Sequence, residues 1–306
     1  MISKEGARSS ESAMTRAGSF EGAAPARGVS VSLPDDPLVT IKPSDSWVAL
    51  DLHSLWAYRE LLYFLIWRDL KVRYKQTILG IAWVVMQPLL ITLIFTVFLG
   101  FLVRVPSDGV PYPLFVYIGL LPWTFFSSAV TNSGNSLVSN AHLITKVYFP
   151  RLLVPASAVG ARLMDFGIAF VLLGVLMAYY RVAPTRNIIA LPGLIVLVTL
   201  FALGCGMLIS ALNVKYRDIG IMIPVLMQLW MFVSPVVYPQ SIVPPKWQTL
   251  YAFNPLVGII SGFRAAVLGE AFNSTALIIS VLVTFALLAY SAYMFRRVEK
   301  SFADVV

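Results

Sequence analysis

The chain has few of the side chains from which catalytic and metal sites are built. Its single cysteine, Cys205, lies in an apolar, Gly-rich stretch, so an intrachain disulfide and a cysteine-based metal cluster are excluded. Its two histidines, His53 and His142, have no companions at the spacing of a zinc site. No acidic pair is placed for acid–base chemistry at a predicted membrane face. We therefore expect no catalytic residues and no metal site in this chain.

A phosphate-binding loop is missing as well. The sequence contains no G-x-x-x-x-G-K-S/T pattern and no Gly-Lys dipeptide, so it cannot hold a nucleotide in that way. We expect no cofactor in this chain. Any work driven by a nucleotide would have to come from another protein.

Charged residues are scarce, and this scarcity indicates a membrane protein. Only 12% of the residues are charged and 58% are apolar, whereas a soluble domain has roughly 25% charged residues. The net charge of +8 could suggest a nucleic-acid partner. The basic residues gather at the ends of apolar runs, however, where anionic lipid headgroups are the natural partner. We therefore expect no nucleic-acid binding.

The longest apolar run predicts the first membrane span and its direction. Residues 77–103 carry no charge, and at ~1.5 Å per helical residue they exceed the ~30 Å of a bilayer's hydrocarbon core. Basic residues before a first span stay on the cytoplasmic side, so the N-terminus should be inside. These residues are Arg59, Arg68, Lys71, Arg73 and Lys75.

Further apolar runs predict an all-α integral membrane fold with six transmembrane helices and a cytoplasmic C-terminus. The other five spans are expected at about 113–131, 152–180, 188–212, 219–238 and 271–295. Between the last two, the pieces 247–253 and 256–268 are too broken for a span and read as external re-entrant or surface helices. In this topology twelve Lys and Arg residues flank the inside ends and five flank the outside ends, which supports the orientation.

The residues before the first span divide into two parts. Residues 1–46 are rich in Ser, Ala, Gly and Pro and should form a disordered cytoplasmic tail. Residues 54–76 should form a helix whose charge-free centre is too short to span, so a helix lying in the cytoplasmic interface fits best. A helix packed on a soluble partner is the alternative.

Arg162 and Asp165 are the one ionisable pair deep within a predicted span. Their i, i+3 spacing places them on one helix face, where each can offset the cost of the other's charge. The pair could serve as a gate or a proton site. It could equally be a structural pair that packs against a neighbouring helix.

Several segments together resemble the membrane permease of type-2 ABC transporters that export polysaccharides such as O-antigen, capsule or teichoic acid. They are RELLYFLIWRDLKVRYKQTILGIAWVVMQPLL, YPLFVYIGLLPWTFFSSAV, LVSNAHLITKVYFPR, SALNVKYRDI, SPVVYP and NPLVGIISGFR. The resemblance implies a homodimer in the cytoplasmic (inner) membrane, paired with two copies of a separate ATPase that binds ATP and Mg²⁺. The substrate would be an undecaprenyl-linked glycan moved outward.

Other classes of function stay open at this stage. One is a membrane-embedded enzyme that acts on lipid-linked sugars, and another is an ion-coupled flippase. An enzyme should show clustered Asp, Glu or His residues, and an ion-coupled carrier should show several buried charges and more spans.

The resemblance assigns the cytoplasmic segment 136–151 to coupling with the ATPase. This segment alternates apolar and polar residues, as a short helix seated in a groove of a partner would. Burial of its apolar residues in the headgroup region is the alternative. The coupling residues would be Leu137, Asn140, His142, Leu143, Ile144, Lys146, Phe149 and Arg151. The turn 213–218 would make a further contact.

Aromatic residues near the external side could line a path for sugars, because ring faces stack on the C–H faces of pyranoses. The alternative is the interfacial aromatic belt that any span has. The candidates are Tyr112, Tyr117, Trp123, Phe125, Phe126, Trp230, Tyr238, Trp247, Tyr251 and Phe253.

Overall fold

The computed structural model describes residues 56–75, 81–146 and 149–299. The predicted tail 1–46, the start of the predicted interface helix and the first residues of the first predicted span lie outside this part. The described residues form helices and turns, without a strand among them. The elements are α2 (Arg59–Lys75), α3 (Ile81–Phe95), the π-helix η1 (Thr96–Leu102), α4 (Tyr112–Ser139), α5 (Ala141–Lys146), α6 (Leu153–Tyr179), η2 (Arg186–Ala190), α7 (Leu191–Lys215), α8 (Asp218–Val233), η3 (Gln240–Ile242), α9 (Pro245–Ala252), α10 (Pro255–Leu268) and α11 (Ser274–Glu299).

Five helices of the described part are long and apolar enough to cross a membrane. They are Ala82–Leu102, Tyr112–Ser139, Leu153–Tyr179, Arg186–Lys215 and Ser274–Glu299. α9 and α10 bend by 101° at their junction, as a broken span or a re-entrant loop does, and they would make a sixth crossing if counted as one span. The prediction of an all-α integral membrane fold is thus confirmed.

The fifth predicted span, 219–238, is shorter in the structure. α8 has 16 residues and ends at Val233, so at ~1.5 Å per residue it reaches about 24 Å. The helix stops because Ser234 precedes Pro235, and a residue before proline is driven out of the helical region. Ser234 is extended, with φ −111° and ψ 148°.

The second predicted span, 113–131, is longer in the structure. Its helix, α4, continues through the polar sequence TNSGNS to Ser139. The polar side chains there bond to carbonyls one turn earlier, so they need no water: Thr131 donates to Ser127 at 2.7 Å and Asn135 donates to Thr131 at 3.0 Å. The polar cluster therefore belongs to the second half of this helix and does not mark its end.

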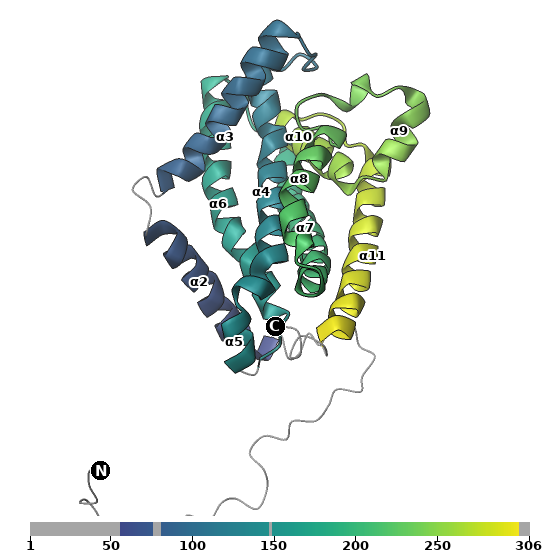
Figure 1. Cartoon of the computed structure of the whole chain (residues 1–306). Coiled ribbons are helices and arrows are strands. Elements are labelled where there is room, and N and C mark those ends of the chain that lie inside the picture. Colours follow the sequence, from purple (N-terminus) through teal and green to yellow (C-terminus); the bar gives the residue numbers. More distant parts are fainter. Residues whose placement is uncertain (1–55, 76–80, 147–148, 300–306) are drawn as a thin grey trace, which may run out of the picture. The chain divides into compact units, whose positions relative to one another are not determined.

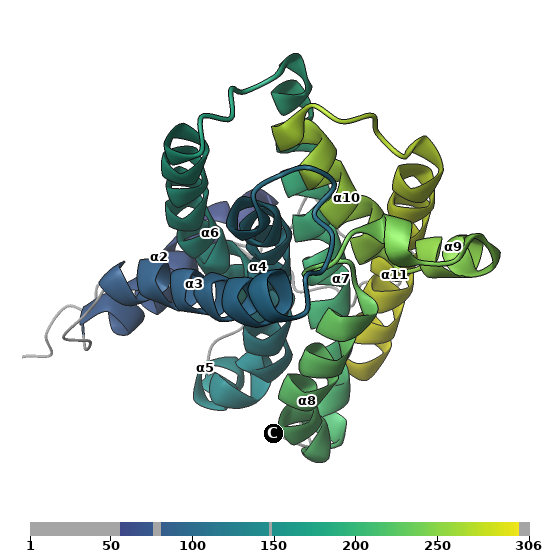
Figure 2. The same ribbon diagram turned by 90° about the horizontal axis from the view of Figure 1, so that it is seen from above.

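α4 is the most buried of the long helices and forms the centre of the bundle. Viewed along its axis it is surrounded by α3, α6, α7 and α10 (Figure 2). Its aromatic rings pack inside the bundle, where Phe126 stacks on Phe201 of α7 at 4.9 Å between ring centroids. The edge of Trp230 from α8 closes on the same two rings. Ring packing of this kind ties α7 and α8 to α4.

A second apolar cluster joins α2 and α5 to the ends of α6, α7 and α11. Leu65 of α2, Leu153 of α6 and Phe295 of α11 are buried in it. In Figure 1 this end of the bundle lies opposite the α9–α10 pair. The two ends of the spans therefore have different architectures: a helix layer at one end and a bent helix pair at the other.

The packing of α10 on α11 depends on one glycine. A side-chain carbon at Gly258 would clash with the carbonyl oxygen of Ala276 and the hydroxyl of Ser280. That hydroxyl also donates to the carbonyl of Pro255 at 2.8 Å. Small residues permit this close approach of two helices within a membrane protein.

We predict that Gly258→Ala destabilises the protein, because α10 and α11 would have to separate to admit the methyl group. Overpacking of this kind costs typically ~1–3 kcal/mol. Thermal unfolding of the purified protein in mild detergent measures the effect. The matched control is Gly174→Ala in α6, where an added carbon meets nothing within 4 Å and the unfolding temperature should hold or rise. Equal behaviour of the two variants would contradict the assignment.

Candidate functional site

Asp165 lies on the face of α6 that contacts α2, and three donors converge on its carboxylate. Arg162, one turn earlier, donates from Nη1 to Oδ2 at 3.2 Å. Arg73 forms an ion pair with the same oxygen, and the hydroxyl of Tyr74 donates to Oδ1. The predicted pair of Arg162 and Asp165 is thus part of a larger network that attaches α2 to α6.

The network extends to α4 through an amide. Arg162 donates from Nη2 to the Oδ1 atom of Asn132 at 2.5 Å. The side chains of Arg162 and Asp165 are only 12% and 18% exposed, so their attraction is weakly screened by water. Burial and the hydrogen bond to Asp165 raise the pKa of Tyr74, which keeps this hydroxyl a proton donor at neutral pH. Three helices are held together at this point.

A polar groove opens next to this network, between α2, α4 and α6. Its cavity volume is about 470 Å³. Arg68 lies in its wall and donates to Asp69 at 2.8 Å and to the Oδ1 atom of Asn140 at 2.8 Å. Its lining includes Arg68, Asp69, Val72, Arg73, Asn132, Asn135, Asn140 and Arg162. We call this cavity the polar groove.

A buried asparagine connects α4 to the turn before α8. Asn213 donates from Nδ2 to the carbonyl of Gly134 and to the Oδ1 atom of Asn135, both at 3.0 Å. Its Oδ1 atom accepts from the backbone N–H of Gly220 at 3.0 Å. The predicted contact turn 213–218 is therefore fixed from within. Its exposed residues include Lys215 and Arg217.

The predicted coupling segment 136–151 consists of the last turn of α4, the short helix α5 and a turn that reaches α6. Leu137, Ile144 and Phe149 are buried in the cluster shared with α2 and α11, and Leu143 packs at its edge. Asn140 begins α5, because its carbonyl accepts from the backbone N–H of Leu143 at 2.9 Å. Arg151 donates to the carbonyl of Glu299 at 2.6 Å. Residues 147–148 lie outside the described part.

The apolar side chains of this segment face the chain's own helices in this structure. Ile144 is 8% exposed and packs in the cluster with Leu65. That these side chains anchor α5 in a partner's groove stays a prediction. The exposed side chains of α5 are His142, Thr145 and Lys146, and Val138 lies exposed just before them. The alternation of apolar and polar residues is explained by a helix seated on its own bundle.

Four of the ten candidate aromatics are core residues in this conformation. Tyr117, Trp123, Phe125 and Phe126 are at most 5% exposed. The hydroxyl of Tyr117 donates to the carbonyl of Ala169 at 2.7 Å. These rings could contact a passing sugar only after repacking, because their faces are covered by neighbouring side chains of α6, α7 and α8.

The polar groups of other candidate aromatics form hydrogen bonds around the turn that follows α8. Tyr112 donates to the carbonyl of Val237 at 2.8 Å, and the hydroxyls of Tyr238 and Tyr251 lie 2.9 Å apart. Trp230 donates from Nε1 to Asn254 at 3.2 Å. Among the ten candidates, Trp247 and Phe253 are the two with more than half of their surface exposed, at 53% and 59%.

One of the five cations counted at the outside ends of the spans, Arg264, holds the same turn from inside. Arg264 of α10 is 5% exposed and donates to the carbonyls of Val236 at 2.7 Å and Tyr238 at 3.3 Å. Its guanidinium lies 3.7 Å from the ring centroid of Phe115. Two carbonyls of this non-helical turn thereby gain a cationic donor. The composition of this region gave no sign that the cation is internal.

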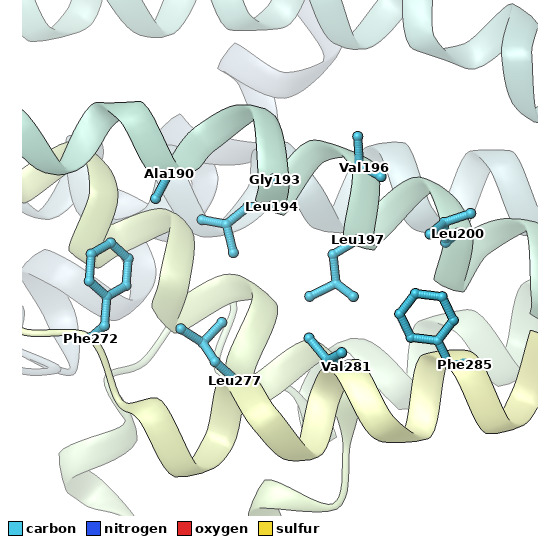
Figure 3. A pocket seen from close by; sticks show the side chains of 10 residues that line it. All are labelled: Ala190, Gly193, Leu194, Val196, Leu197, Leu200, Phe272, Leu277, Val281 and Phe285. Carbon is cyan, nitrogen blue, oxygen red and sulfur yellow. The ribbon is translucent and has the colours of Figure 1, made fainter.

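A second groove, between α7 and α11, is apolar. Figure 3 shows its lining, in which Leu194, Leu197 and Leu277 face one another across the gap. Its cavity volume is about 480 Å³, and Phe272 and Phe285 lie at its two ends. Both walls are candidate membrane spans. Such a surface suits a hydrocarbon chain and offers no hydrogen bonds to a sugar.

We predict that Asp165→Asn reduces the amount of folded protein, because Arg162 would lose its charge partner in a nearly buried site. Removing one member of a buried pair costs about 3 kcal/mol. The double variant Arg162→Gln, Asp165→Asn should recover much of the loss. Both are measured by detergent-extracted monodisperse protein and its thermal unfolding.

Asp69→Asn is the matched control for this prediction. Asp69 pairs with Arg68, and both side chains are about one-third exposed, so the loss should be within ~1 kcal/mol. If Asp165→Asn and Asp69→Asn proved equally mild, the network would not hold α2 on the bundle.

Comparison with known proteins relates this architecture to a transporter family. Residues 60–268 match the ABC-2 type transporter family. The O-antigen export system permease protein RfbA of Myxococcus xanthus is 31% identical over 217 residues, covering 70% of this chain and 82% of that protein. RfbA of Klebsiella pneumoniae is 27% identical over 248 residues, covering 81% and 95%. The polysialic acid transport protein KpsM of Escherichia coli is 22% identical over 209 residues, covering 66% and 78%.

The family match begins at the second residue of α2 and ends at the last residue of α10. It therefore includes the network on Asp165, the polar groove, α5 and the bent helix pair. The relatives are named as permeases and transport proteins, which supports a permease subunit and not an enzyme. The chain belongs to the ABC-2 type transporter family, as a multi-pass membrane permease that associates with an ABC ATPase.

Proposed function

We propose that this chain is the membrane subunit that exports a lipid-linked polysaccharide outward across the cytoplasmic membrane. The observation that carries the proposal is its similarity to two O-antigen export permeases, each covered over more than four-fifths of its length. The polysialic acid transport protein is a more distant relative with a related cargo. The resemblance read from the sequence adds that the carrier lipid is undecaprenyl.

Energy would enter from a separate ATPase subunit, present in two copies, which binds ATP and Mg²⁺. Moving a polar polymer across ~30 Å of hydrocarbon requires an energy source, and this sequence has no phosphate-binding loop. Both termini would be cytoplasmic, because Lys and Arg predominate at that side of the spans. In this orientation α2 and α5 face the cytoplasm and the α9–α10 pair faces outward.

The surface that receives the ATPase would be the exposed side of α5. His142, Thr145 and Lys146 project from this helix, while Ile144 on its opposite side is buried among Leu65 and other residues of the apolar cluster. Contact at α5 is therefore contact with a helix that is packed on α2 and on the ends of the spans. The turn with Lys215 and Arg217 would add a second, basic contact.

We predict that the double variant His142→Asp, Lys146→Glu abolishes co-purification of the ATPase and export while the permease stays folded. Both side chains are exposed, so the substitutions add negative charge to this surface without disturbing the core. Affinity purification of the tagged permease and immunoblotting of surface polysaccharide measure the two effects. Lys246→Glu on α9, at the other end of the bundle, is the control and should leave the complex intact.

Ile144→Asp separates this interpretation from simple misfolding. Because Ile144 is buried, an aspartate there should lower the amount of folded permease itself. If the His142→Asp, Lys146→Glu variant still recovered the ATPase normally, the assignment of α5 as the ATPase contact would be refuted.

The path for the glycan would lie between two copies of the chain. The protomer's centre is filled by α4 and its stacked rings, which leaves no room there for a hydrated polymer without extensive repacking. α8 presents a row of exposed apolar side chains at helical spacing, and most side chains of Ala82–Leu102 are exposed as well. A second copy would cover these surfaces in a symmetric dimer. The row on α8 is Ile221, Val225, Leu229 and Phe232.

We predict a dimer by native mass spectrometry in mild detergent, and disulfide cross-links from single cysteines along the α8 row. Cys205 is buried and would be replaced by alanine beforehand so that the introduced thiol is the one that reacts. Val171→Cys on α6 is the control: it is equally exposed to lipid but lies outside the proposed interface. A stable monomer that still exports would refute the dimer.

A further inference from the structure

We propose that the polar groove between α2, α4 and α6 binds the phosphate group of a lipid headgroup. The groove lies beside the network on Asp165 and has a volume of about 470 Å³, which exceeds the space that a phosphate or diphosphate needs. The phosphate could belong to a bilayer phospholipid or to the carrier lipid of the exported glycan. Only the second source rests on the proposed function.

Arg162 supplies unused hydrogen-bond donors to the groove. An arginine carries five N–H groups. Two of those on Arg162 donate to Asp165 and Asn132, so three have no partner among the described residues. The Nε atom of Arg162 is not among the fully buried atoms without a partner, in contrast to the Nε atom of Arg264. Arg162 lines the groove, so these donors are available to a ligand there.

Arg68, on the opposite wall, also keeps donors free. Its Nε and Nη2 atoms donate to Asp69 and Asn140, which leaves the two N–H groups of Nη1 without a partner in the described part of the chain. Guanidinium groups on two sides of one cavity suit a phosphate, because their planar donor pairs match its oxygens.

The asparagine amides of the groove turn their oxygens toward the protein. Asn132 accepts from Arg162, Asn140 accepts from Arg68, and Asn135 accepts from Asn213. Each amide nitrogen uses one hydrogen on a carbonyl of α4, and its second hydrogen has no partner among the described residues. Each of these amide oxygens is thus already paired with a donor of the protein, while the amide N–H groups stay available, which favours an anion as the ligand.

The net charge of the groove also favours an anionic ligand. Arg68, Arg73 and Arg162 line the groove, against the carboxylates of Asp69 and the adjacent Asp165, so three positive charges face two negative ones. Exposed Lys71 and Lys75 on α2 add to the positive field.

Apolar residues beside the groove suit a lipid. Val72 lines the groove and is exposed. The same helix, α2, carries exposed Tyr63, Phe64 and Trp67, the residues of a helix that lies at the headgroup level of a bilayer. A headgroup phosphate would enter the groove while its hydrocarbon lies along these exposed apolar side chains.

The test is a binding measurement with the full-length chain in phosphatidylcholine nanodiscs. Farnesyl diphosphate is the first probe, with farnesol as the probe that lacks phosphate, and phosphatidylglycerol in the nanodisc is the competitor. We expect saturable binding of farnesyl diphosphate and none of farnesol. Arg68→Gln, and separately Arg162→Gln with Asp165→Asn, should weaken binding by about 10-fold each, the effect of one charge-assisted hydrogen bond.

Arg186→Gln is the matched control, since it removes one arginine charge from an exposed position outside the groove. It should bind as the unmodified chain does. Competition by phosphatidylglycerol would identify a bilayer phospholipid as the ligand, and binding that resists it would identify the diphosphate of a carrier lipid; both outcomes support the site. The absence of farnesyl diphosphate binding, or equal loss in Arg186→Gln, would overturn it.

This experiment does not depend on the ATPase or on export. A chain that binds the probe but exports no polysaccharide would refute the proposed function and leave the phosphate site standing. If the unmodified chain bound no probe while the Arg68→Gln variant exported normally, the site would be refuted and the function would stand.

Discussion

The structure depends on satisfying polar groups inside a bundle whose surroundings supply little water. Asp165 illustrates the constraint: its carboxylate would be costly alone, but with Arg162, Arg73 and Tyr74 it becomes the point at which α2 joins the spans. The same rule explains the long polar half of α4, where hydroxyls and amides bond to the preceding turn or to neighbouring helices. Polar residues here hold helices together, and some of them also form the wall of a groove.

Patterns within one stretch of sequence correctly predicted those features that depend on neighbouring residues of the same helix. The apolar runs predicted the long helices, and the i, i+3 spacing predicted that Arg162 and Asp165 would meet. Arg73 and Tyr74 were not predicted as their partners, because pairing α2 with α6 brings together residues about ninety positions apart. Nothing in the spacing along one helix contains that information. The prediction of helix ends failed for a similar reason. TNSGNS has the composition of a loop, but its side chains donate hydrogen bonds to carbonyls of the preceding turn and the helix continues.

Amphipathic residues were the hardest to place from sequence. Aromatic rings at the ends of spans can lie in a lipid belt, a substrate path or the core, and the rings of Tyr117 and Phe126 lie in the core because they face α6 and α7. Arg264 was counted among the cations at the outside ends of the spans, whereas it is buried and donates to two carbonyls of the turn after α8. In both cases the composition of a span predicts which residue types occur at a given depth in the membrane. It does not predict what each of them contacts, because that depends on neighbours from other helices.

The seating of α5 has a mechanical consequence. Ile144, Leu137 and Phe149 share one close-packed cluster with Leu65 of α2 and Phe295 of α11. Packed interiors are nearly incompressible, so a displacement imposed on α5 cannot be absorbed by local compression. It must be passed on as a tilt of α2 and of the span ends together. A force applied to α5 is therefore distributed over several long helices, which move as rigid bodies about the cluster that they share.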